Sequence, residues 1–114
     1  MAHFWTVKAF LPEMIAAKKG HIVSTASLAG HGGTNKLVDY CASKFANVGF
    51  DEALRTELYV GGHADYIHTT CICPYYISTG MFAGVQVSFY VHQVGNTKLI
   101  SEQNYPDFGA RVRG

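Results

Sequence analysis

Apolar side chains near the start of the chain recur at the spacing of a helix with one apolar face. The stripe consists of Phe4, Val7, Leu11, Met14 and Ile15. We therefore expect a helix from Ala2 to Lys18, with Pro12 either kinking it or opening a turn. Lys18, Lys19 and Gly20 predict its end, because glycine readily adopts the left-handed conformation found there.

Two short runs rich in β-branched residues predict strands, at His21–Ser27 and His68–Cys73. Gly20 and Gly30 bound the first run, and Pro74 closes the second. The first run has a mixed pattern, which is typical of parallel strands that are covered on both faces. We interpret the second run as another buried strand.

A longer amphipathic segment between these strands predicts a second helix, from Leu37 to Tyr59, with Thr34 or Asn35 as its N-cap. Its apolar side would hold Tyr40, Phe45, Val48, Leu54 and Leu58. Its solvent side would hold Asp51, Glu52, Arg55 and Glu57. A strand, a helix and a second strand in succession predict an α/β fold.

The last part of the chain has a weaker pattern. Residues 85–91 alternate and could form a strand, but residues 94–114 are polar and show no clear period. We expect a domain over residues 1–84, followed by a divergent tail over residues 85–114 for which poor order is one interpretation.

Composition narrows the class of protein. A chain of 114 residues with 48% hydrophobic content can form one domain with a core. The net charge of +1 gives no indication of nucleic-acid binding. Three cysteines do not make a disulfide framework and favour a reducing compartment. We expect neither a signal peptide nor a transmembrane segment in this sequence.

The candidate chemistry centres on Tyr40 and Lys44, which lie one helical turn apart. A phenol is too weak an acid to act as a base near neutral pH, but a neighbouring ammonium favours the phenolate. Ser27, at the end of the first strand, could hold a substrate oxygen while Tyr40 moves the proton. These three residues predict a site that interconverts an alcohol and a carbonyl.

Two other clusters allow different interpretations. His68, Cys71 and Cys73 are possible zinc ligands, but no fourth ligand is evident, and buried cysteines often serve as plain apolar residues. The glycines at positions 30, 32 and 33 could cradle a phosphate. However, in the phosphate-binding pattern G-x-G-x-x-G, Gly30 and Gly32 match the first two glycines and Asn35 stands at the third. We expect no metal site and interpret the glycines as a flexible connector.

Three segments, GHIVSTASLAG, DYCASKFANVGF and TTCICPYYISTGMF, resemble the short-chain dehydrogenase/reductase family over about residues 2–84. Within that family, these segments are most similar in sequence to the membrane-associated branch of retinol and 17-beta-hydroxysteroid dehydrogenases, including the epidermal retinol dehydrogenase type. The resemblance implies a partial Rossmann-like, doubly wound parallel sheet. The chain would correspond to a C-terminal half domain that lacks the first βαβ units.

The resemblance also implies roles for individual residues. Ser27 would orient the substrate oxygen, Tyr40 would be the acid/base, and Lys44 would hold the nicotinamide ribose. Pro74 would begin a loop that closes over the nicotinamide, in which Ile77 offers backbone groups and Thr79 its hydroxyl. The cofactor would be NAD or NADP, because the residue that chooses between them lies outside the resembling segments. Tyr75 departs from the glycine that most members have after the proline.

The function implied by the resemblance is an NAD(P)-dependent oxidoreductase acting on a lipophilic alcohol or carbonyl of the retinoid or steroid class. The family further implies a homodimer formed through the two helices, at the endoplasmic reticulum membrane or a lipid droplet. An alternative is a non-catalytic, truncated fragment that associates with full-length subunits through the same helices.

Overall fold

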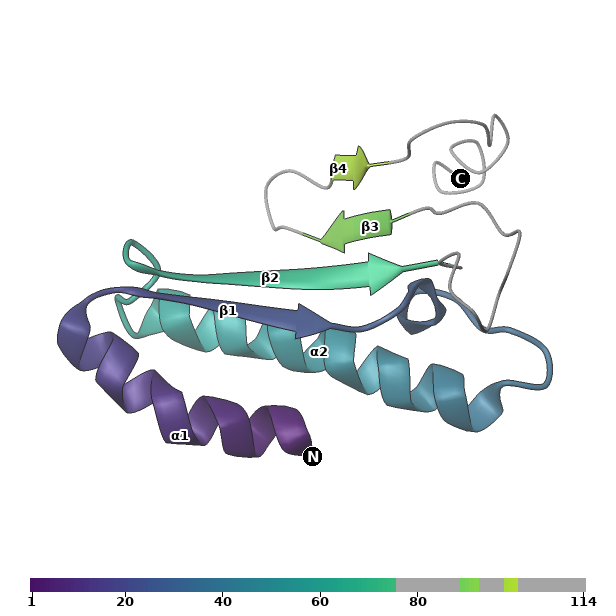
Figure 1. Cartoon of the computed structure of the whole chain (residues 1–114), viewed down its shortest axis with the longest axis horizontal. Helices are drawn as coiled ribbons and strands as arrows, with labels where there is room; N and C mark the ends of the chain where they lie inside the picture. Colours follow the sequence, from purple (N-terminus) through teal and green to yellow (C-terminus); the bar gives the residue numbers. More distant parts are fainter. Residues whose placement is uncertain (76–88, 93–97, 101–114) are drawn as a thin grey trace, which may run out of the picture.

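The computed structural model describes residues 1–75, 89–92 and 98–100. In chain order these residues form α1 (Ala2–Ala17), β1 (Gly20–Thr25), the short 3-10 turn η1 (Leu28–Gly30), α2 (Val38–Val60), β2 (Ile67–Pro74), β3 (Phe89–His92) and β4 (Lys98–Ile100). The strands make one sheet in the order β1-β2-β3-β4 (Figure 1). The pair β1 and β2 is parallel, with α2 as the crossover, which confirms the α/β prediction.

The first helix ends one residue before the predicted position and continues through Pro12, so no turn opens there. It stops because Lys18, and not the predicted Gly20, adopts the left-handed conformation, at φ 49°. Gly20 instead begins β1, where a Cβ atom would lie 2.7 Å from the sulfur of Met14. Any larger residue at this position would require the Met14 side chain to move.

Both helices lie on the same side of the β1–β2 pair, as Figure 1 shows. The core joins Leu54 and Leu58 of α2 to Ile67 of β2, with the α1 residues Val7, Leu11, Met14 and Ile15 packed against them. On the other face of the pair, His21, Val23 and His68 are exposed. In the described part of the chain the helices cover one face of this pair, and cover of its second face stays a prediction.

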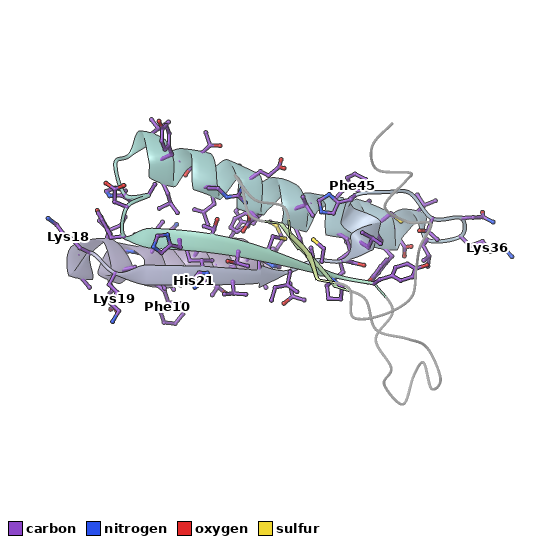
Figure 2. All side chains as sticks on the ribbon, turned by 90° about the horizontal axis from the view of Figure 1, so that it is seen from above. Phe10, Lys18, Lys19, His21, Lys36 and Phe45 are labelled. Carbon is purple, nitrogen blue, oxygen red and sulfur yellow. The ribbon has the colours of Figure 1, made fainter. Side chains whose placement is uncertain are left out.

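The second helix agrees with its predicted bounds within a residue, but its faces differ from the prediction. Val48, Leu54 and Leu58 are buried as expected, whereas Tyr40 and Phe45 are 42% and 47% exposed. Phe45 extends from α2 in Figure 2, in which Lys36 lies at the opposite end of the molecule from Lys18 and Lys19. Leu37 occupies the N-cap position, and no side chain caps the helix, so the predicted cap by Thr34 or Asn35 is wrong.

A buried polar cluster replaces part of the predicted solvent face of α2. Asp51 is only 1% exposed and forms an ion pair with Arg55. Ser24 Oγ donates to Asp51 Oδ1 at 3.2 Å, and Arg55 Nε donates to Thr69 Oγ1 at 3.1 Å. These two charged residues of α2 thus face the sheet, while Glu52 and Glu57 are exposed as predicted.

The remaining strands extend the sheet in the antiparallel sense. β3 pairs with the last four residues of β2, and β4 pairs with β3. The predicted strand over residues 85–91 overlaps β3, and its first four positions lie outside the described residues.

Candidate active site

Ser27 lies just after β1, where the chain turns toward α2. It has an extended backbone and caps η1, since its Oγ accepts a hydrogen bond from the Ala29 N–H at 3.2 Å. The same hydroxyl donates to the carbonyl of Pro74 at 3.3 Å. Ser27 is 9% exposed. Because it follows β1 and bonds to the last residue of β2, it links the carboxyl ends of the two strands.

Gly30 brings the turn that follows Ser27 onto α2. A Cβ atom at this position would lie 2.7 Å from the backbone oxygen of Lys44 and 2.8 Å from Val48 Cγ2. Only glycine permits this approach without a shift of backbone. The interpretation of Gly30 as part of a flexible connector was wrong, whereas Gly32 and Gly33 face open space.

Tyr40 lies in the first turn of α2, and Lys44 follows one turn later. The Lys44 Nζ atom lies 5.5 Å from the centroid of the Tyr40 ring, within the range of a cation–π contact. Because Tyr40 is 42% exposed, a substrate can approach its side chain from solvent. The helix thus provides a phenol and an ammonium side by side.

The structure connects the predicted catalytic residues through short links. Ser27 bonds to Pro74, Gly30 joins the turn of Ser27 to the backbone of Lys44, and Lys44 contacts Tyr40. Within the part of the chain that the structure describes, no hydrogen bond joins Ser27 to Tyr40. Ile77 and Thr79, predicted to contact the nicotinamide, lie outside the described residues.

The arrangement of the strands suits a nucleotide cofactor. In open α/β sheets, ligands bind beyond the carboxyl ends of the parallel strands. Ser27 and Pro74 follow or end the two parallel strands at this edge, and the turn after Ser27 packs against α2 at Lys44. The hydroxyl of Tyr40 and the ammonium of Lys44 are groups that can bond to ribose hydroxyls. The described residues therefore fit the cofactor that the resemblance implies.

The interpretation of Cys71 and Cys73 as plain apolar residues agrees with their burial. Both thiols face α2, whereas His68 is exposed on the opposite face of β2. The three side chains cannot converge on one ion. No group of three possible metal ligands occurs among residues 1–75 or in the described parts of β3 and β4.

A model of the short chain dehydrogenase family matches residues 1–87 of the chain. Members of this family use NAD or NADP. The matched range contains Ser27, Tyr40, Lys44 and Pro74, and also Ile77 and Thr79.

Curated proteins similar to the chain carry related names. "Short-chain dehydrogenase/reductase family 16C member 6" of Bos taurus is 53% identical over 89 residues, which are 78% of this chain and 28% of that protein. "Retinol dehydrogenase 10" of Xenopus tropicalis is 54% identical over 86 residues, which are 75% of this chain and 25% of that protein. "Epidermal retinol dehydrogenase 2" of Homo sapiens is 54% identical over 83 residues, which are 73% of this chain and 26% of that protein.

The chain thus spans about a quarter of the length of these relatives. Within that quarter, the matched segment includes the parallel pair β1–β2, the crossover helix and the Ser27, Tyr40 and Lys44 positions. Sequence, fold and site lead to the same assignment: the chain belongs to the short-chain dehydrogenase family.

Proposed function

We propose that this chain carries the proton-transfer residues of an NAD(P)-dependent oxidoreductase that interconverts an alcohol and a carbonyl. The observation that supports the proposal most directly is the contact between Tyr40 and Lys44, one turn apart on α2 and beside the turn of Ser27. The names of the relatives favour a lipophilic substrate of the retinoid class, with steroids as the alternative.

In the proposed reaction, Ser27 holds the substrate oxygen. Its bond to the Pro74 carbonyl is 3.3 Å long, beyond the common range for hydroxyl donors, so the hydroxyl can turn toward a substrate at small cost. Tyr40 removes the proton of the alcohol as a phenolate and returns it in the reverse direction. Lys44 places a positive charge beside the Tyr40 ring.

The nicotinamide cofactor accepts or supplies the hydride when it is bound. Lys44 and Tyr40 would hold its ribose, and Pro74, Ile77 and Thr79 would lie along its nicotinamide end. The chain's own contribution is to position the substrate oxygen and to move one proton.

A test of the proposal compares two tyrosines of the same helix in the native polypeptide that contains this sequence. Tyr40→Phe should lower NAD(P)-dependent turnover of retinol at least about a hundredfold, because the general acid/base is lost. Tyr59→Phe removes a hydroxyl from a residue that is 77% exposed near the end of α2, and it should leave turnover unchanged. Absorbance of the reduced nicotinamide measures the rate, and cofactor titration checks that binding is retained.

A second candidate function is a non-catalytic subunit that associates with full-length relatives. The large exposed side chains of the two helices favour it, among them Phe4, Trp5, Phe10 and Phe45. These helices would also form the proposed homodimer of an active enzyme.

Turnover retained by Tyr40→Phe contradicts the first proposal. A wild-type polypeptide that is inactive and co-purifies with a longer family member would favour the second.

A location at the endoplasmic reticulum membrane or at a lipid droplet is part of the same proposal, on the basis of the family resemblance. The described helices contain no span long and apolar enough to cross a bilayer. Fractionation of cells that express the native polypeptide would measure its distribution between membranes, droplets and soluble extract.

A further inference from the structure

Two cysteines that the proposed reaction does not use lie side by side under the sheet. Cys71 and Cys73 are on the same face of β2, and neither side chain is exposed. Their sulfur atoms are 3.8 Å apart. Cys41, on α2, makes no contact with another thiol in the described part of the chain. The pair on β2 is therefore a preformed dithiol.

The dithiol also contacts an exposed loop. The Cys73 sulfur is 3.4 Å from Nε2 of His31, and residues 31–40 are all exposed. This loop is the side from which we expect a small reagent to approach Cys73.

The surroundings of the pair favour a nucleophilic sulfur. The pKa of Cys71 is lowered from 9.0 to about 7, chiefly because the Cys73 thiol donates a hydrogen bond to it, with a further contribution from Ser24. The same bond, together with burial, raises the pKa of Cys73. Near neutral pH, Cys71 provides a thiolate while Cys73 keeps its proton.

A direct disulfide fits this geometry poorly. Two residues of an extended strand advance about 6.6 Å between Cα atoms, at the upper limit for a disulfide. The sulfur atoms would also have to approach from 3.8 Å to about 2.05 Å. A bridging atom that bonds to both sulfurs leaves them farther apart and keeps the strand extended.

We propose that Cys71 and Cys73 form a chelating site for monoorganic compounds of trivalent arsenic, soft electrophiles that take two thiolate ligands. With phenylarsine oxide, the Cys71 thiolate attacks arsenic first and Cys73 then closes the ring. Two arsenic–sulfur bonds form, the arsenic–oxygen bond is lost, and the oxygen leaves as water with one proton from the Cys73 thiol and one from solvent, which replaces the proton that Cys71 lost on ionisation. Arsenic stays trivalent, so no electrons are transferred.

The test treats the folded 114-residue chain with phenylarsine oxide in excess 2-mercaptoethanol and measures the intact mass. We expect one adduct per chain that resists the monothiol and is reversed by 2,3-dimercaptopropanol. Cys71→Ser and Cys73→Ser should each weaken capture at least tenfold. Cys41→Ser removes the thiol that lies outside the pair and should capture the reagent like the wild type.

His31→Ala provides a test that leaves the core intact. Because the ring of His31 contacts Cys73 from the exposed loop, its removal should make capture of the arsenical several times faster than in the wild type, with the same stoichiometry. Circular dichroism checks that each variant is folded. Capture that survives loss of either β2 thiol would overturn the proposal. So would equal affinity of the folded chain and of the chain in urea, because the C-x-C sequence alone would then account for binding.

Discussion

At the scale of single residues, Asp51 links α2 to the sheet through its bond to Ser24. Its carboxylate is buried and bonds to Arg55 and Ser24. Arg55 is 20% exposed, and its Nη1 atom is buried without a hydrogen-bond partner in the described part of the chain. The guanidinium therefore depends on Asp51 for compensation of its charge.

Asp51→Asn should lower the free energy of unfolding by about 3 kcal/mol, because it leaves the charge of Arg55 unpaired in a largely buried position. Glu57→Gln makes the same change of charge at an exposed position of the same helix and should have almost no effect. Urea unfolding followed by circular dichroism measures both. Equal stability of the two variants would show that the ion pair contributes nothing.

The residue scale is also where sequence reasoning had least success. Charged residues are rarely buried, so Asp51 and Arg55 were assigned to solvent. Tyr40 and Phe45 fell on the apolar stripe and were assigned to the core, yet both are exposed. Helical spacing identifies a face, but the partners that decide burial, here Ser24 and Thr69, come from strands far away in sequence.

At the scale of elements, the contact of η1 with α2 connects the candidate catalytic residues. It depends on Gly30, whose position leaves no room for a side chain. The sequence showed a cluster of glycines, but not which of them is packed. That distinction requires the tertiary contact with Lys44.

Gly30→Ala should separate η1 from α2, because its Cβ would lie 2.7 Å from the Lys44 backbone oxygen. We expect a loss of about 2 kcal/mol in the free energy of unfolding. Gly32→Ala is the matched control, since nothing lies within 4 Å of its Cβ position. Chemical denaturation distinguishes the two variants, and a Gly30→Ala protein as stable as the control would contradict the close contact.

The bounds of the elements were predicted well, because they follow from local signals. Apolar periodicity located both helices, and β-branched runs ending at Pro74 or a glycine located β1 and β2. The antiparallel pairing of β3 with β2 was not foreseen. It joins residues from different parts of the chain, and no local signal specifies that partner.

At the scale of the whole molecule, the dithiol makes stability depend on pH. Between pH 7 and 9 the unfolded chain still binds the proton that folded Cys71 has lost. The pair's contribution to the free energy of unfolding therefore rises with pH in this window. Above pH 9 the unfolded chain loses the proton of Cys73, which the folded chain keeps, so the contribution falls.

Urea unfolding at pH 7, 8 and 9 tests this dependence. The wild type and Cys41→Ser should gain stability across the window relative to Cys71→Ser, which lacks the titrating thiol. Parallel profiles for all three proteins would mean that the pair does not shift the proton equilibrium.

The family was readable from the sequence, since Ser27, Tyr40 and Lys44 lie in segments that resemble it, and a family model matches residues 1–87. The roles of these three residues stay predictions. The arrangement of layers was less accessible. The structure places both helices on one side of the β1–β2 pair. The pattern of the first strand alone had suggested cover on two sides.

The position of β1 at the end of the sheet has a consequence for handling the protein. Among the described residues, β1 pairs with a strand on one side only, where it meets β2. Val23 is 54% exposed on this strand. A segment that pairs with the other side of β1 would satisfy its backbone groups and compete with edge-to-edge association of two copies.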